Sequence, residues 1–322
     1  HYLRGLMQAD PNKKNMERME ERVPNADEQQ LQHMLSDSPW DHQAVIDQVA
    51  LQADGLLGGN RNSCLLIDES GFKKSGCHSV GVARQWCGRL GKVENCQVGV
   101  FAALGRDRRV TLVDERLYLP EKWTGDPPRC EQAGIPPEFR GFKKKVTLAL
   151  EMVAHQRRIG VRFSWVGADG FYGNDPAFLR GVEAMDEIFV ADVHCDQLIF
   201  LEDPKPSVKE KRGKRGRKPT KLEANAPAIR VDQWPSEQPD AAWKRIKVGD
   251  SSRGELEVEV LHRRVWLWNK EETEAHCWHL IVRREVNAPQ EVKYTLSNAP
   301  AETRVDRLAE MQAQRYLSLI HI

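Results

Sequence analysis

The stretch FSWVGADGFYG, residues 163–173, carries the strongest fold signal in this chain. Its apolar run, 163–167, is typical of a buried strand. One carboxylate, Asp169, follows the run, and the two glycines after it, Gly170 and Gly173, predict a turn. An acid in this place either caps the next element or belongs to a site at the edge of a sheet, and both interpretations stay open here.

A second apolar run, 64–67, ends in an acid in the same way, at Asp68. Two carboxylates that lie close together repel each other strongly unless a cation sits between them. Hard divalent cations such as Mg²⁺ prefer carboxylate oxygens. The pair of Asp68 and Asp169 is therefore a candidate metal site, and capping of strand or helix ends is the alternative for each acid alone.

The segments between and around these runs alternate in type. An apolar pattern predicts strands, and a 3.6-residue period predicts helices. The order is strand, hairpin, helix, strand, helix, strand, which predicts an α/β layer. The segments are strands at 64–67, 97–104, 110–119, 163–166 and 188–191, and helices at 145–158 and 176–185.

The flanking regions have a different character. Residues 1–57 are polar and helical in pattern, whereas 199–299 contains strand patterns such as the strict alternation at 255–260. The sequence turns helical again from 300. We therefore predict four parts: an N-terminal helical module (1–60), an α/β core (61–198), a β-rich insertion (199–299), and the start of a last core helix (300–322).

Composition limits the class of protein. The chain has 322 residues, with 40% hydrophobic and 30% charged residues and a net charge of +1, so any nucleic-acid binding must use local patches. Its seven cysteines include no CxxC pair, which favours a reduced cytoplasmic protein. No run approaches 18 apolar residues, so we expect no membrane span.

Three motifs carry a family resemblance: LLIDESGFKKSG (65–76), SVGVARQWCGRLGKVENCQVGVF (79–101) and WVGADGFYG (165–173). They resemble DDE transposases of bacterial insertion sequences, in the group with a β-rich insertion before the last catalytic residue. The resemblance implies a ribonuclease-H-like mixed sheet flanked by helices. It also implies that Asp68 and Asp169 are the first two catalytic carboxylates and that they hold Mg²⁺ or Mn²⁺, as two ions.

The third acid of that family is a Glu a few residues after an Arg-aromatic pair. Arg315-Tyr316 matches the pair, so the Glu is expected near 319, where the sequence reads LSLIHI over 317–322. Glu310 is nine residues too early, about two and a half turns away. We therefore expect a chain truncated within its catalytic helix, inactive as written, with two of three carboxylates.

Several basic residues are candidates for DNA contact. The run 209–221 has eight basic residues in thirteen and suits phosphate contact, with a solvated loop as the alternative. Tyr172 either contacts a phosphate or packs at the sheet edge. The predicted DNA-binding residues are Lys73, Lys74, Arg84, Tyr172, Lys211, Arg212, Lys214, Arg215, Arg217, Lys218 and Arg315.

Two other features have simpler explanations. Five tryptophans in the insertion are expected to be core residues, although stacking on a flipped base is the alternative; they are Trp234, Trp243, Trp266, Trp268 and Trp278. The His and Cys residues at 194–196 and 276–279 do not make a four-ligand set, so we do not predict zinc.

The resemblance implies a transposase that cleaves double-stranded DNA at terminal inverted repeats and joins it to target DNA. It also implies a homodimer on DNA, a DNA-end-binding role for 1–60, and a place at the bacterial nucleoid in the cytoplasm. Two alternatives remain: a truncated protein that binds ends without cutting, and a stand-alone ribonuclease-H-like nuclease.

Overall fold

The computed structural model describes residues 1–8, 10, 15–209, 220–251, 254–270 and 272–316. It separates into two compact units, His1–Val45 and Ile46–Ile322. Within the described part no helix is long and apolar enough to cross a membrane. Because the two units are separate bodies, each is considered by itself.

The first unit is helical, as predicted. Its small core packs Met19 and Leu31 with partly buried neighbours that include Tyr2 and Leu6. Asn15 and Asp27 cap two of the helices by accepting hydrogen bonds from Arg18 N and Gln30 N. The helices are α1 (Tyr2–Gln8), α2 (Met16–Arg22) and α3 (Glu28–Ser36), and α4 (His42–Leu57) begins in this unit.

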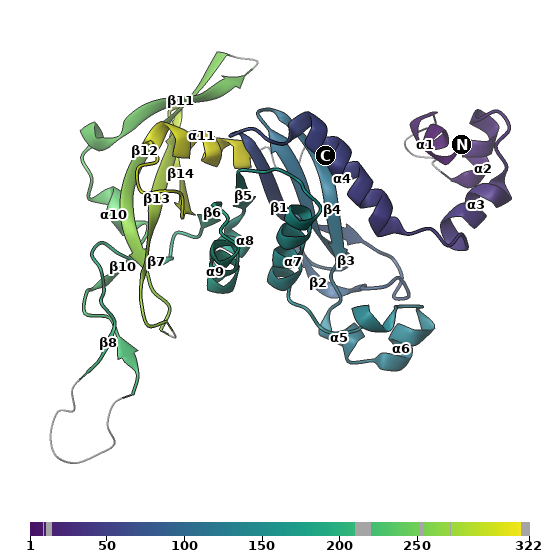
Figure 1. Cartoon of the computed structure of the whole chain (residues 1–322), viewed down its shortest axis with the longest axis horizontal. Helices are drawn as coiled ribbons and strands as arrows, with labels where there is room; N and C mark the ends of the chain where they lie inside the picture. Colours follow the sequence, from purple (N-terminus) through teal and green to yellow (C-terminus); the bar gives the residue numbers. More distant parts are fainter. Residues whose placement is uncertain (9, 11–14, 210–219, 252–253, 271, 317–322) are drawn as a thin grey trace. The chain divides into compact units, whose positions relative to one another are not determined.

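The second unit is built on a mixed sheet, in which five strands form the core in the order β4-β3-β1-β5-β6 (Figure 1). The first three are antiparallel, and β5 and β6 run parallel to β1. This arrangement is the predicted ribonuclease-H-like one, so the fold prediction is confirmed. The strands are β1 (Ser63–Lys73), β3 (Lys92–Arg106), β4 (Arg109–Leu117), β5 (Trp165–Ala168) and β6 (Phe189–Val193).

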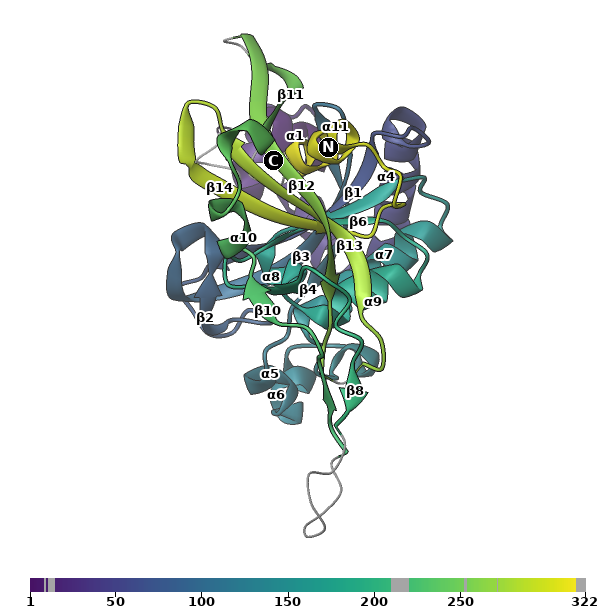
Figure 2. The ribbon, with the colours of Figure 1, turned by 90° about the vertical axis from the view of Figure 1, so that its left-hand side faces the viewer.

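Helices cover both faces of this sheet. Side chains alternate between the faces of a strand, so Leu65 and Ile67 of β1 pack with α7 (Lys145–Arg158) and α9 (Pro176–Ala184), whereas Cys64 and Leu66 pack with Met311 of α11 (Val305–Arg315). Figures 1 and 2 show α7 and α9 on the opposite side of the sheet from α11.

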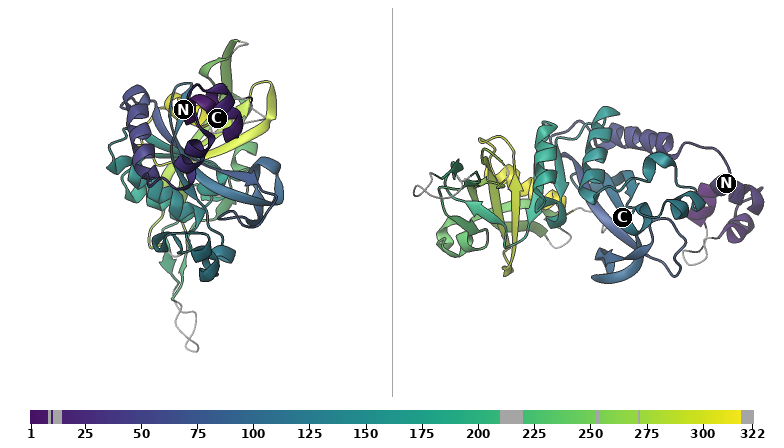
Figure 3. Two further views of the ribbon diagram at one scale, coloured as in Figure 1. Left: turned by 90° about the vertical axis from the view of Figure 1, so that its right-hand side faces the viewer. Right: turned by 90° about the horizontal axis from the view of Figure 1, so that it is seen from below.

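The β-rich block is joined to the core through one strand pair. Strand β14 pairs antiparallel with β6, with Leu296 opposite Ala191, so the core sheet continues into the block as β6-β14-β13-β12-β7-β10 (Figures 2 and 3). The bounds are β7 (Leu198–Phe200), β10 (Ala228–Arg230), β11 (Lys244–Ser251), β12 (Gly254–Leu267), β13 (His276–Glu285) and β14 (Ala288–Ser297).

The remaining elements are short. A separate two-stranded pair, β8 with β9, flanks the basic run 209–221 in sequence. Their bounds are β2 (Ala83–Cys87), β8 (Ser207–Val208), β9 (Leu222–Glu223), α5 (Glu121–Thr124), α6 (Pro127–Gln132), α8 (Gly170–Gly173), α10 (Gln233–Ser236), and the 3₁₀ turns η1 (Gly88–Leu90), η2 (Pro137–Phe139) and η3 (Asp240–Ala242).

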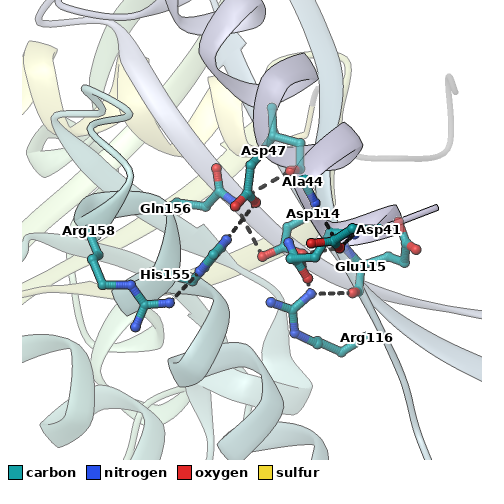
Figure 4. Close-up of polar contacts among 11 residues, drawn as sticks. Asp41, Ala44, Asp47, Asp114, Glu115, Arg116, His155, Gln156 and Arg158 are labelled. Carbon is teal, nitrogen blue, oxygen red and sulfur yellow. Dashed lines mark hydrogen bonds and ion pairs between the residues drawn. The ribbon is translucent and has the colours of Figure 1, made fainter. Parts of the chain in front are cut away.

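Charged side chains anchor α4 against the core. His155 of α7 contacts Asp47 of α4 with 2.7 Å between Nε2 and Oδ1, and Arg158 lies 2.6 Å from Nδ1 of the same imidazole (Figure 4). On β4, Asp114 accepts from Gln156 Nε2 at 3.2 Å and pairs with Arg116. Each acid here is matched by a donor, which indicates a structural cluster.

Candidate active site

Three carboxylates follow the same point on three adjacent strands. Ile67 of β1 is opposite Ala168 of β5, and Ala168 is opposite Ala191 of β6. The next residues on the three strands are Asp68, Asp169 and Asp192. Because neighbouring strands are about 4.8 Å apart, this register brings the three acids together at one edge.

All three acids lie on the face that α11 partly covers. Trp165 and Val190 pack with Met311 on that face, and Asp169 and Asp192 follow them at even spacing. Asp68 is two residues beyond Leu66, another member of that cluster. The helix ends at Arg315, so the acids lie where its cover ends.

Asp169 is held by the start of the short helix α8. Its Oδ1 accepts a hydrogen bond from Phe171 N at 3.0 Å, so the capping interpretation holds together with the site interpretation. Gly173 closes this turn against β6, and a Cβ there would lie 1.8 Å from the carbonyl oxygen of Asp192. Glycine is therefore required for α8 to lie against the acidic edge.

Asp68 does not end its strand, contrary to the prediction. Strand β1 continues to Lys73, because its residues beyond Ile67 stay paired with β3 after the pairing with β5 has stopped. The carboxylate of Asp68 accepts from Glu69 N at 2.8 Å. A strand with a partner on only one side leaves room beside Asp68 for Asp169.

The electrostatics of this pair favour a bound cation. Burial, together with the charge of Asp169, raises the pKa of Asp68 to about 6. Burial also raises the pKa of Asp169, while the nearby Arg315 guanidinium opposes that shift. Two half-buried carboxylates that repel each other are stabilised by a cation between them.

Asp192 is a third acid that the sequence analysis missed. It is 9% exposed, and its Oδ1 accepts from Thr295 Oγ1 at 2.6 Å. Its Oδ2 accepts from Tyr316 OH at 3.0 Å and pairs with Arg315. The signal was present, because the predicted strand 188–191 also ends in an acid.

The donor set of Asp68 and Asp169 fits a hard divalent cation, since both are carboxylates on rigid backbone. Asp192 already accepts three hydrogen bonds and is less free to act as a ligand. Across the described ranges, no three His, Cys, Asp or Glu side chains are grouped as metal ligands. The expected position 319 lies outside the described residues.

A cavity of about 1190 Å³ opens beside the acids. Asp68, Asp169 and Asp192 line it together with aromatic and basic residues of β2, η1 and β14. It lies on the part of the sheet face that continues beyond α11. The cavity gives a ligand access to the pair of catalytic candidates.

The predicted DNA-binding residues near the site occupy different places. Arg84 is exposed and is opposite Asn95 on β3, on the same sheet face as Asp68. Lys73 alternates to the other face, 3.7 Å from Glu94 Oε2. Lys74 follows the end of β1, where its backbone pairs with Asn95. DNA contact by these residues stays a prediction.

Two predicted DNA-binding residues are buried. Tyr172 is 0% exposed and packs with its ring centroid 5.2 Å from that of Phe178, which favours the packing alternative. Arg315 is 8% exposed and is paired with Asp192. Six others lie outside the described residues, so their role stays a prediction: Lys211, Arg212, Lys214, Arg215, Arg217 and Lys218.

Comparisons with known proteins show which family this chain matches and which individual proteins it resembles. A family model described as DDE superfamily endonuclease matches residues 1–255. A probable transposase for insertion sequence element IS701 from Microchaete diplosiphon is 31% identical over 159 residues, which is 47% of this chain and 37% of that protein. The crystal structure of the NurA nuclease from Sulfolobus solfataricus has 10% identity and a TM-score of 0.32, covering 84% of this chain and 82% of that one. A structural likeness that distant carries no argument.

Proposed function

Because this chain belongs to the DDE superfamily endonucleases, we propose that its acidic sheet edge catalyses cleavage of DNA at transposon ends and strand transfer. The register that aligns Asp68 with Asp169 is the observation that carries this proposal. The similarity to a probable transposase supports it. That match spans little more than a third of the relative's length, so substrate and partners are part of the proposal.

Asp68 and Asp169 would hold Mg²⁺ or Mn²⁺, as two ions, which would supply charge stabilisation for phosphoryl transfer. The protein's own contribution is placement. The parallel pairing of β1 with β5 holds the two backbones in register, and the α8 cap orients Asp169. Rigid, preorganised groups avoid reorganisation during the reaction, which is the main source of catalysis in such sites.

The proposed partner is double-stranded DNA, at terminal inverted repeats and at the target. Arg84 and the run 209–221 would contact phosphates, and each such contact releases counterions. Residues 1–60 would help to bind the ends within a homodimer. The four-part division of the chain that was predicted from sequence belongs to this proposal.

The test measures metal binding and DNA nicking in the same variants. Asp68→Asn and Asp169→Asn keep the side-chain size and remove one charge each. The control, Asp196→Asn, makes the same change at an exposed residue that is not one of the three acids at the sheet edge. We expect the first two to weaken Mn²⁺ binding at least ten-fold in calorimetry, whereas the third leaves it unchanged.

Nicking of supercoiled plasmid by the parent chain, lost in both site variants, would support cleavage and would contradict the expectation that two of three carboxylates leave the chain inactive. Normal Mn²⁺ binding by Asp169→Asn would show that the metal site has been assigned wrongly. Binding to transposon ends without nicking by the parent would replace the proposal with the alternative of an end-binding protein. Nicking without preference for inverted repeats would favour the stand-alone nuclease.

A further inference from the structure

The face of the sheet that carries Asp68 continues beyond the cover of α11. Along β1 the next side chains on this face are Ser70 and Phe72, opposite Gly99 and Gln97 of β3. Both β1 residues line the cavity beside the acids. The cavity therefore has a floor that is a direct extension of the catalytic edge.

Two aromatic side chains on this floor are exposed. Trp86 is 53% exposed and Phe72 is 44% exposed. The ring of Phe72 meets Phe101 edge-on at 6.2 Å between centroids, which leaves part of it open to the cavity. By contrast, Trp165 and Trp278 are at most 2% exposed, so core packing explains those residues but not Trp86.

The register of β2 sets the direction of Trp86. It is opposite Val93 of β3, and Val93 is on the same side of β3 as Phe101, which is opposite Asp68. Trp86 and Asp68 thus lie on one sheet face and line one cavity. An aromatic face open to a wet cavity is suited to a flat apolar ligand.

The charges around the cavity define the rest of that ligand. Arg89 of η1 and Lys293 of β14 line it, and exposed Arg84 is on the same face as Trp86. A ligand with flat rings on an anionic backbone is a nucleic-acid strand. In a duplex the faces of the bases are covered by stacking, so the exposed rings fit an unpaired base.

We propose that Trp86 and Phe72 stack an unpaired DNA base beside the acidic edge. This inference rests on the proposed function for its substrate. It gives the site a preference for DNA that is single-stranded next to the bond to be cut. Stacking of this kind tolerates sequence, because every base has a flat face.

The experiment compares two DNA hairpins in buffer without divalent metal. One is blunt, and the other has a short unpaired extension that carries 2-aminopurine. We expect the parent chain to bind the extended DNA about ten-fold more tightly and to quench the 2-aminopurine fluorescence. Trp86→Leu and Phe72→Leu are expected to lose the preference and the quenching while binding blunt DNA as before.

Phe139→Leu is the matched control, because Phe139 is 56% exposed but does not line the cavity. A parent chain without preference for the extension would overturn the inference, as would Trp86→Leu that keeps both preference and quenching. Loss of self-association in Trp86→Leu with unchanged quenching would instead assign the rings to a protein interface. Because no metal is present, failure of cleavage leaves this test intact.

Discussion

Asp192 of β6 and Arg315 of α11 form a buried ion pair that joins the sheet edge to the last helix. The stem of Arg315 passes over β5, where its Cγ would lie 3.3 Å from a Cβ on Gly167. Tyr316 and Thr295 complete the hydrogen bonding of the carboxylate. The end of α11 is thus fixed beside Asp169 by a residue that is not itself a candidate ligand.

Asp192→Asn is therefore expected to destabilise the protein. Removing one partner of a buried ion pair leaves the other charge without compensation, which costs about 3 kcal/mol. The double variant Asp192→Asn/Arg315→Met should recover part of that loss, since it also removes the orphaned cation. Urea denaturation of the parent, both single variants and the double variant measures the coupling. Additive losses would contradict a direct pair.

The raised pKa of Asp68 predicts a trade between stability and metal binding. The native protein holds this proton more tightly than the unfolded chain does, so stability falls as pH rises from about 4 through about 6. Asp68→Asn should raise the free energy of unfolding at about pH 7 by up to about 3 kcal/mol and change it little at about pH 4. Denaturation at both pH values checks the sign.

Added Mn²⁺ tests whether the carboxylate that lowers the stability of the parent chain also binds a metal. The parent chain should be stabilised by Mn²⁺ at about pH 7, because a ligand that binds only the native state shifts the unfolding equilibrium. Asp68→Asn should respond much less. Equal stabilisation of the two proteins by Mn²⁺ would mean that Asp68 does not bind the metal, and that the gain in Asp68→Asn comes only from removal of its charge.

Local patterns predicted much of the core. The helix predicted at 145–158 forms with those bounds, because its apolar face packs on the sheet and basic residues lie in its last turn. Asp68 and Asp169 were identified because each follows an apolar run. The two acids were expected to lie close together, because each follows a strand of the same sheet. The structure supplies the register of β1 with β5 that aligns them.

The features that the sequence did not predict depend on contacts between residues that are distant in the chain. The β-rich block was expected as an insertion, but its fusion with the core depends on β14 finding β6 about a hundred residues earlier in the chain. Asp192 was missed although it follows a predicted strand. Its partners Thr295 and Arg315 are distant in sequence, so the local pattern marks the acid but not the contacts that hold it at the edge.

Gly173 offers a test of the α8 contact. A Cβ at this position would lie 1.8 Å from the carbonyl oxygen of Asp192, and backbone cannot move aside cheaply. We expect Gly173→Ala to destabilise the protein by about 2 kcal/mol or more and to weaken Mn²⁺ binding through displacement of Asp169. Thermal melts and calorimetry measure the two effects.

Gly76→Ala is the control for that variant, since a Cβ there would meet nothing within 4 Å. It should leave both quantities unchanged. A Gly173→Ala protein with parental stability would mean that α8 shifts without cost, and the close contact would then have no role in shaping the edge.

The salt dependence of DNA binding tests Arg84. If its guanidinium meets a phosphate, Arg84→Gln should weaken binding and reduce the slope of log K against log salt by about one unit. Arg108→Gln, in the exposed turn between β3 and β4, makes the same change of charge away from the cavity. Equal slopes for the parent and Arg84→Gln would remove Arg84 from the DNA contacts.

A variant of Tyr172 distinguishes a packing role of this residue from contact with a DNA phosphate. Its hydroxyl is buried and has no hydrogen-bond partner among the described residues. Burial also raises the pKa of the phenol well above its usual range. An unsatisfied buried polar group costs about 1 kcal/mol or more, so Tyr172→Phe should be neutral or stabilising in urea denaturation. Because the ring packs with Phe178 in either variant, DNA affinity and its salt slope should stay at the parental values. A reduced slope in Tyr172→Phe would show that the hydroxyl reaches a phosphate when DNA binds.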